Sequence, residues 1–130
     1  MLLIRTFLAP SQIQGLGLFA GENVPEGTVV WTYVPTVDKL IDIEDFDKLP
    51  CLMQEVCKRY AYLDNRTTKY VLCGDDARFV NHSDLPNTVG RYPEGEIYGI
   101  DVATRLIKQG EEITCDYSTF DAEFACKLRS

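Results

Sequence analysis

The sequence predicts a single, mostly β domain with one or two short helices. Several short runs are rich in β-branched and aromatic residues, and turn-forming Gly, Pro, Asn and Asp residues separate them. Helical periodicity is confined to one segment near the middle of the chain and a shorter one at its end. Strands and helices do not alternate regularly, which argues against a doubly wound parallel sheet.

The composition is that of an ordinary globular domain with an acidic balance. The 130 residues are 45% hydrophobic and carry a formal net charge of −7. A chain of this size buries roughly two-thirds of its unfolded surface without help from disulfides or metals. The acidic balance argues against direct nucleic-acid binding and favours basic partners.

No membrane association is expected, because the apolar run in residues 1–10 is interrupted by Arg5 and is too short to span a bilayer. This run also lacks the architecture of a signal peptide. We therefore expect an intracellular protein, cytoplasmic if bacterial, with the nucleus of a host cell as the other compartment left open.

The first half of the chain predicts β-structure interrupted by turns. Residues 2–8 form an apolar run closed by Ala-Pro-Ser, and residues 13–20 carry a second run. After a Pro-Glu-Gly turn, residues 28–34 are dense in β-branched and aromatic residues. Residues 38–48 are acidic and are predicted to be a surface connection.

One amphipathic helix is predicted across residues 50–60. Pro50 suits its first turn, and apolar side chains follow at helical spacing, which predicts packing on the sheet: Leu52, Met53, Val56, Cys57 and Tyr60. Alternating residues 60–63 and 70–72 on either side of a polar turn then predict a hairpin.

The C-terminal third predicts two more strands and a short helix. Residues 96–102 and 113–117 carry strand patterns, and Phe120, Phe124 and Leu128 recur at helical spacing. We expect residues 1–119 to form the domain and residues 120–130 a short helical tail.

The cysteines predict free thiols. The five cysteines form an odd number and include no C-x-C or C-x-x-C pair: Cys51, Cys57, Cys73, Cys115 and Cys126. A Cys-His hydrolase is disfavoured, because none of them lies in a nucleophile motif beside the single histidine, His82.

Three segments carry candidate chemistry, although each has an ordinary structural explanation by itself. Gly15-Leu16-Gly17 can be a glycine turn, the histidine-containing segment 78–87 can be capping and turn residues, and segment 110–117 can be a turn entering a strand. Their order is more informative than any one of them. In sequence, they read G-x-G, R-F-x-N-H-S-x-x-P-N and G-E-E-x-x-x-D-Y, and they span residues 15–117.

Together these blocks resemble the signatures of SET-domain protein lysine methyltransferases, and the short acidic chain is most similar to the stand-alone bacterial or viral type. The resemblance implies a β-clip fold with a C-terminal pseudoknot, in which the Tyr117 segment passes beneath the loop of Asn81 and His82. It also implies S-adenosylmethionine-dependent methyl transfer to the ε-amine of a protein lysine. The alternative from another class is a non-catalytic SET-like module that binds cofactor or peptide.

The resemblance also implies site residues. Tyr117 corresponds to the catalytic tyrosine. Either Tyr60 or Tyr62 lines the site, and the sequence does not distinguish them, because residues two apart on a strand lie on the same face. The cofactor would contact the backbone of Gln14, Leu16 and Gly17, with Arg78 and Asn81 at its methionine end, His82 at the adenine and Phe120 as a covering residue. Phe120 and Phe124 are the candidates for a lid.

Cys115 is expected in the substrate channel, on the same strand face as Tyr117. Family members commonly have Phe or Tyr at this position, two residues before the catalytic tyrosine. A smaller side chain leaves room for di- or trimethyl-lysine, although Tyr62 or Tyr98 could fill the gap.

No zinc is expected, because this chain departs from the family's zinc-binding pattern. Asp84 follows the N-H-S motif in place of cysteine, and residues 118–130 contain only Cys126.

The expected chemistry requires a neutral lysine amine. A lysine of ordinary pKa about 10.4 is almost fully charged at neutral pH. A sulfonium about 4 Å away at an effective dielectric near 20 opposes the ammonium by about 4 kcal/mol, so Tyr117 can orient the amine without being a strong base.

The expected partner is a basic, lysine-containing protein or peptide. Acidic stretches at residues 38–47 and 94–96 would attract it. The sequence leaves monomer and homodimer open.

Overall fold

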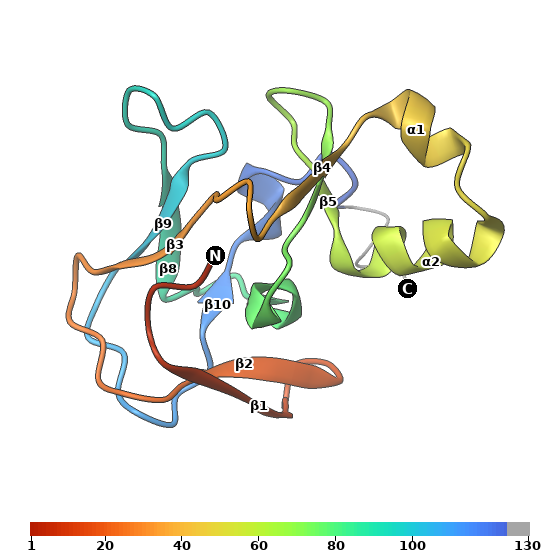
Figure 1. The fold of residues 1–130 in the computed structure, drawn as a ribbon. Coiled ribbons are helices and arrows are strands. Elements are labelled where there is room, and N and C mark those ends of the chain that lie inside the picture. The colour runs from red at the N-terminus through yellow and green to blue at the C-terminus, as the bar shows by residue number, and fades with distance from the viewer. Residues whose placement is uncertain (125–130) are drawn as a thin grey trace.

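The computed structural model describes residues 1–124, which fold into four small sheets with two α-helices and two 3₁₀ helices (Figure 1). The strands are β1 Thr6–Pro10, β2 Leu16–Ala20, β3 Val29–Thr32, β4 Lys39–Ile41, β5 Tyr62–Leu63, β6 Tyr70–Leu72, β7 Asn81–His82, β8 Thr88–Arg91, β9 Ile100–Ala103 and β10 Thr114–Cys115. The helices are α1 Ile43–Asp47, α2 Cys51–Tyr60, η1 Asp76–Phe79 and η2 Tyr117–Thr119. The predicted mostly β class is confirmed.

The β1–β2 hairpin forms one edge of the molecule. The strands pair antiparallel with Phe7 opposite Phe19, and the two rings stack with their centroids 5.6 Å apart. β2 buries Leu18 and Ala20 completely. The predicted strand at residues 2–8 begins later, because Leu2 bridges to Trp31 of β3 instead.

The main core lies under the three-stranded sheet β3–β9–β8, with β9 in the middle. β8 was not predicted from the sequence. The strand predicted at residues 96–102 begins only at Ile100, because Gly95 and Gly99 adopt positive φ and fold the preceding residues into turns. The buried core includes Val24, Ile107 and Ile113.

A second, smaller core lies between the sheet β4–β6–β5 and the two helices. The prediction of a surface connection at residues 38–48 is wrong, because this segment contains β4 and α1. Phe46 supplies the driving force: it is 5% exposed and stacks on Tyr70 at 4.4 Å. Asp38 is also buried, at 3% exposure, whereas the other acidic residues of the segment are exposed: Asp42, Glu44, Asp45 and Asp47.

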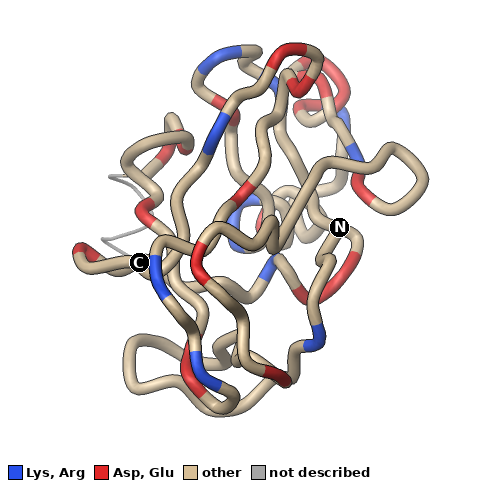
Figure 2. Tube along the Cα trace, turned by 90° about the vertical axis from the view of Figure 1, so that its left-hand side faces the viewer, with Lys and Arg blue, Asp and Glu red and all other residues tan. Residues whose placement is uncertain are grey.

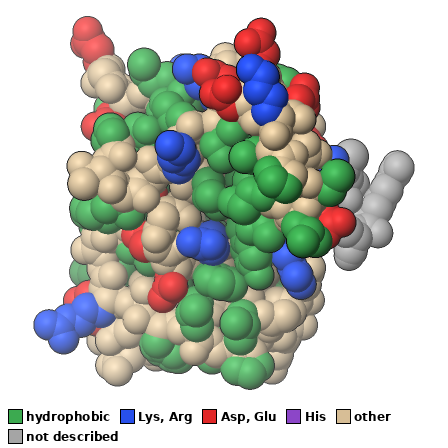
Figure 3. Space-filling view, turned by 45° about the vertical axis from the view of Figure 1, so that its right-hand side comes forward, with side chains coloured by type: hydrophobic (Ala, Val, Ile, Leu, Met, Phe, Trp, Pro, Cys, Tyr) green, Lys and Arg blue, Asp and Glu red, His purple; other side chains and the backbone are tan. Residues whose placement is uncertain are grey.

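Helix α2 forms where the periodicity predicts it, but it packs less closely than expected. Among its apolar residues only Cys57 is buried, whereas Leu52 is 77% exposed and Met53 and Val56 remain partly open. In Figure 3 the side of the molecule that carries α2 is turned toward the viewer, and hydrophobic side chains gather on this face.

The hairpin predicted in the middle of the chain is present as β5 and β6, joined antiparallel with Tyr62 opposite Val71. It is shorter than predicted, because Tyr60 is the last residue of α2 and Ala61 ends that helix. Tyr60 and Tyr62 therefore do not alternate along one strand.

Two of the three motif segments are joined by the parallel pair β7–β10. Asn81 lies opposite Thr114, and His82 lies opposite Cys115. The pair brings residues far apart in the sequence side by side at the centre of the molecule. The pseudoknot itself stays a prediction.

The end of the described chain packs onto β5. Asp64 bridges to Asp121, and the Ala122 N–H donates to the Leu63 carbonyl. Most of the predicted helical tail, including Cys126 and Leu128, lies outside the described residues. Over residues 1–124, no helix is both long and apolar enough to cross a membrane.

Candidate active site

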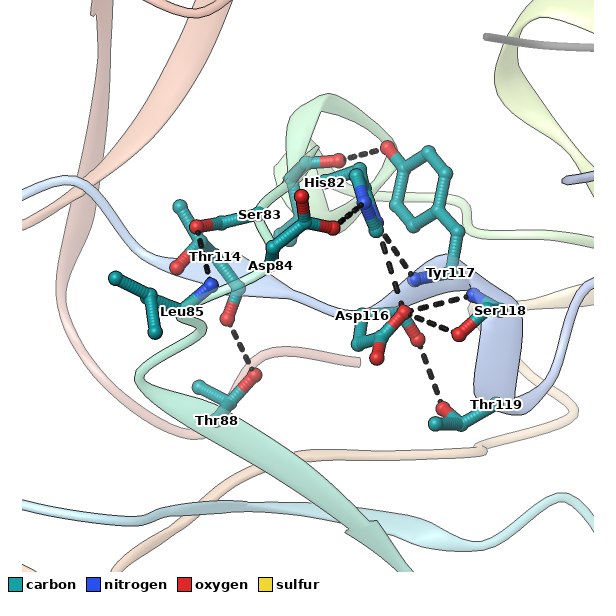
Figure 4. Close-up of polar contacts among 11 residues, drawn as sticks. His82, Ser83, Asp84, Leu85, Thr88, Thr114, Asp116, Tyr117, Ser118 and Thr119 are labelled. Carbon is teal, nitrogen blue, oxygen red and sulfur yellow. Dashed lines mark hydrogen bonds and ion pairs between the residues drawn. The ribbon is translucent and has the colours of Figure 1, made fainter.

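Tyr117 is held at the start of η2 by His82, which lies on the adjacent strand β7. The Tyr117 N–H donates to His82 Nδ1 at 3.1 Å (Figure 4). Because a backbone N–H is always a donor, Nδ1 is the acceptor and a neutral ring carries its proton on Nε2. That nitrogen lies 3.0 Å from Asp84 Oδ1, to which it donates. Asp84, His82 and Tyr117 thus form one hydrogen-bonded series.

The Tyr117 side chain turns inward from this anchor. Its hydroxyl donates to the backbone carbonyl of Val80, the residue immediately before β7. Burial, and after it the charge of nearby Cys115, raises the pKa of Tyr117 far above its ordinary value. The phenol therefore stays protonated at neutral pH and acts as a hydrogen-bond donor.

Six of the predicted site residues line one aromatic cavity: Tyr60, Tyr62, Arg78, Cys115, Tyr117 and Phe120. Phe120 contributes its ring edge-on to Tyr62 at 4.8 Å and to Tyr117 at 5.8 Å. Burial raises the pKa of Tyr62 well above its usual value, so this phenol also stays protonated. Neutral aromatic rings thus form much of this cavity's wall.

Tyr60 and Tyr62 both line this cavity, but they lie on different secondary-structure elements and contact different rings. Tyr60 ends α2 and packs edge-on against Phe79 at 5.4 Å, whereas Tyr62 contacts Phe120. The guanidinium carbons of Arg59 and Arg78 each lie 5.7 Å from the centre of the Tyr60 ring. The expected alternation of the two tyrosines on one strand face is therefore wrong.

Cys115 and Tyr117 line the same cavity, but not because they lie on one face of one strand, as predicted. β10 ends at Cys115, and Tyr117 belongs to η2, so strand alternation does not align them. The 3₁₀ turn nevertheless directs both residues to the same cavity. Tyr98, the other residue considered for this space, lines it as well.

The remaining predicted cofactor residues form a second cluster beside the cavity. The Asn81 side-chain amide donates to the carbonyls of Gln14 at 3.2 Å and Leu16 at 3.3 Å. The same amide donates to the Glu112 carboxylate at 2.9 Å. Asn81 thereby ties the first glycine-rich motif to the last one.

Glu112 explains why residue 17 is a glycine. A Cβ at Gly17 would lie 2.4 Å from Glu112 Oε2, so a side chain there would push the Glu112 carboxylate out of its present position. Ser11 Oγ fixes this carboxylate with contacts of 2.8 and 2.9 Å. Glu112 belongs to the Gly-Glu-Glu block but was not predicted as a site residue.

The sequence could not distinguish the two adjacent glutamates of that block. Glu111 turns outward to Arg105, with a contact of 2.9 Å. This hydrogen bond to Arg105, together with the Lys108 backbone N–H, lowers the pKa of Glu111. Only Glu112 faces the glycine motif.

Tyr92 and Asp101 also line the cavity and were not predicted as site residues. Asp101 had a signal, because it is the single acidic residue within the apolar run Ile-Asp-Val-Ala of β9. Burial raises the pKa of its carboxyl to about 6.

Comparison with known proteins agrees with this arrangement. The sequence model of the SET domain matches residues 15–118, which include all three motif segments. The chain belongs to the SET-domain family. The resemblance inferred from the sequence is therefore confirmed at the level of the family.

Related sequences carry SET domains within much longer proteins. The human "Histone-lysine N-methyltransferase 2D" is 34% identical over 92% of this chain, which spans only 2% of that protein. The Schizosaccharomyces pombe "Histone-lysine N-methyltransferase, H3 lysine-4 specific" is 32% identical over 83% of this chain, which spans 12% of it.

A solved structure extends the likeness to the fold. A humanized mutant of the Chaetomium thermophilum Polycomb Repressive Complex 2, bound to an inhibitor, superimposes with a TM-score of 0.66 at 26% identity. The match covers 92% of this chain and 15% of that one. The predicted SET-domain fold is confirmed.

The described part of this SET domain contains no cluster of metal-ligating side chains. Within residues 1–124, no group of three or more His, Cys, Asp or Glu side chains could hold a metal ion. Asp84, at the position of the family's zinc-binding cysteine, instead pairs with His82. Cys126 lies outside the described residues, so the expected absence of zinc stays a prediction.

Proposed function

We propose that this SET domain transfers a methyl group from S-adenosylmethionine to the ε-amine of a protein lysine. One observation carries the proposal: the Tyr117 hydroxyl, fixed through Val80 and His82, enters an aromatic cavity beside the Asn81 cluster. The related proteins are named as histone-lysine methyltransferases, which supports the reaction class. The chain spans a small part of them, so its own substrate is inferred separately.

The donor set around the cavity fits the proposed cofactor. Arg59 and Arg78 lie beside Tyr60 and form no ion pair with any residue of the described part, which suits the cofactor's carboxylate. The aromatic rings suit an adenine. S-adenosylmethionine, when bound, supplies the methyl group on a positively charged sulfur. The residues proposed to hold it are Gln14, Leu16, Gly17, Arg78, Asn81, His82, Tyr60 and Phe120.

Tyr117 is proposed to orient the amine of the incoming lysine. Its raised pKa keeps the phenol protonated, so it is unsuited to removing the lysine's proton. A fixed hydroxyl can instead hold the nitrogen in line for attack, and positioning of this kind supplies large effective molarities. Tyr62 and Cys115 are proposed to line the channel through which the lysine side chain enters.

A basic segment is the proposed substrate, although one expected acidic residue does not take part. The Asp38 carboxylate is buried and lies 2.8 Å from the Met1 ammonium. Figure 2 shows Asp and Glu distributed over several loops, which fits the net charge of −7 acting over the whole surface. Because such attraction is screened over about 8 to 10 Å at moderate salt, substrate KM should rise with ionic strength.

Two measurements on the native chain test the proposal. Isothermal titration with S-adenosylmethionine should give saturable heat, and radiolabelled methyl should then transfer to a mixed library of lysine peptides but not to matched arginine peptides. Binding without transfer would support the SET-like binding module instead. An absence of cofactor binding would overturn both functions.

A further inference from the structure

Asp101 is a carboxylate with an unusual location, in the middle strand of the main sheet and facing the cavity. On β9 it lies opposite Gly90 of β8 and Trp31 of β3. A Cβ at position 90 would lie 3.9 Å from Asp101 Oδ1, so the missing side chain leaves the carboxylate open on that side. Asp101 also lines a second, adjacent hollow, together with Cys115 and Phe120.

No cation of the described chain pairs with this carboxylate. Within residues 1–124, Asp101 forms neither an ion pair nor a side-chain hydrogen bond. The Met1 ammonium acts on it electrostatically, but that group is bound to Asp38 and to the Thr32 carbonyl. The nearby guanidinium of Arg66 lies instead over the Tyr92 ring at 4.0 Å.

The titratable groups that share the cavity with Asp101 include Tyr62 of β5, Asp64 after it, Cys73 after β6, Tyr92 after β8 and Cys115 of β10. The Asp64 carboxylate, unlike that of Asp101, accepts hydrogen bonds from the backbone N–H and the hydroxyl of Thr67. Burial raises the pKa of Tyr62, Cys73 and Tyr92, and the negative charge of Asp101 contributes to each of these shifts. These three groups are therefore neutral at physiological pH and provide no counter-charge.

A second polar group of the cavity lacks a partner. Trp31 lines the cavity at 5% exposure, and its buried Nε1–H has no acceptor among residues 1–124. An unpaired buried donor is costly, and so is a buried carboxylate without a cation. The carboxylate calls for a cationic ligand group, whereas the Trp31 N–H, which is a donor, calls for an acceptor such as a carbonyl of the same ligand.

We infer that the Asp101 carboxylate is the counter-charge that receives the ε-ammonium of the substrate lysine. The inference rests on the proposed function. Asp101 shares its surroundings with the proposed channel residues Tyr62 and Cys115. Among the residues proposed to hold the cofactor, Tyr60, Arg78 and Phe120 also line the aromatic cavity, whereas the cluster of Gln14, Leu16, Gly17 and Asn81 lines neither hollow. Asp101 and the channel residue Cys115 line both hollows, which favours the substrate cation over the cofactor's sulfonium.

This role acts on substrate affinity and specificity, not on the transfer step. A carboxylate beside an ammonium stabilises the charged form, so it strengthens binding without helping the proton to leave. Because burial raises the pKa of Asp101 to about 6, the carboxyl is ionised at pH 7.5 and becomes neutral below pH 6. The KM for a lysine peptide should therefore rise as the pH falls through 6.

The direct test uses n-butylammonium chloride as a probe for the lysine side chain and the native chain labelled with ¹³C at aspartate. Adding the probe should lower the pKa of Asp101 in an NMR titration, whereas neutral n-butanol at the same concentration should leave it unchanged. An unchanged titration with n-butylammonium would overturn the inference. If the probe binds but no lysine peptide is methylated, the cation site stands and the proposed function fails.

Kinetics with the isosteric variant Asp101→Asn provide the second readout. The variant should raise the KM for a lysine peptide at least tenfold, with kcat within about threefold of the native value and an unchanged Kd for S-adenosylmethionine. Glu26→Gln removes an equal charge from an exposed turn outside the cavity and outside the acidic stretches at residues 38–47 and 94–96, so it should leave all three values unchanged. A KM that stays native in Asp101→Asn would reject the counter-charge role.

Discussion

Replacing Tyr117 with Phe removes one oxygen atom and tests the proposed role of the hydroxyl. The ring keeps its neighbours His82 and Phe120, at 5.6 and 5.8 Å, so buried apolar area is nearly unchanged. The backbone N–H of residue 117 also keeps its bond to His82. The change is therefore confined to the hydroxyl and to the Val80 carbonyl that accepts from it.

The expected magnitude differs between stability and catalysis. Leaving the part-buried Val80 carbonyl without this donor should lower the free energy of unfolding by about 1 to 2 kcal/mol. Loss of orientation at the reacting nitrogen should reduce turnover by about 100-fold or more, because misplacement of about 1 Å has effects of that size. Cofactor affinity should stay close to native, since the hydroxyl is proposed to position the amine.

Urea unfolding, titration calorimetry with S-adenosylmethionine and initial rates with one lysine peptide measure the three quantities. Tyr70→Phe is the matched control: Tyr70 is buried against Phe46, outside the cavity, so its variant should change stability without changing turnover. Turnover within a few-fold of native in Tyr117→Phe would refute the positioning role. A loss of cofactor affinity that parallels the loss of turnover would refute it as well.

Three other substitutions have distinct expected outcomes. Asn81→Ala removes three hydrogen bonds, including the one to Glu112, and should weaken cofactor binding by about 1 to 3 kcal/mol in calorimetry. The control Asn65→Ala loses only a surface bond to the Thr119 carbonyl and should leave cofactor binding unchanged. Native protein should yield di- or trimethyl-lysine by mass spectrometry and Cys115→Tyr should shift products toward monomethyl-lysine; exclusive monomethylation by the native chain would contradict this. Asp101→Asn should raise the free energy of unfolding at pH 7.5 by up to about 3 kcal/mol, because the folded-state pKa of about 6 exceeds the ordinary 3.8. The free energy of unfolding of the native domain should fall as pH rises from 4 to 6, because Asp101 ionises, whereas that of Asp101→Asn should not. Parallel pH profiles of the two proteins would contradict the raised pKa of Asp101.

The sequence was most informative where a pattern is local. Strand β1, helix α2 and the hairpin of β5 and β6 all follow from spacing and turn residues within a few positions. It failed where a long-range contact decides the outcome. Phe46 makes residues 43–47 a packed helix, although acidic side chains dominate the composition of that segment.

In the candidate site, too, the sequence predicted some residues, whereas long-range contacts decided others. The three motifs identified the family and nominated Tyr117, Asn81 and His82 from residue type and order alone. The sequence could not say which glutamate of the Gly-Glu-Glu block turns inward, because both orientations satisfy a turn followed by a strand. Contacts with Ser11 and Asn81 decide for Glu112.

By itself, then, the sequence determined the mostly β class, the family and the residue types of the chemistry, because these depend on local spacing and on the identity of short motifs. The tertiary structure decided which distant residues share a cavity. The parallel pair β7–β10 brings Cys115 to His82, and β9 places Asp101 opposite Gly90. Such neighbours are set by strand register across the fold, where shifting one strand by a single residue turns every side chain to the opposite face.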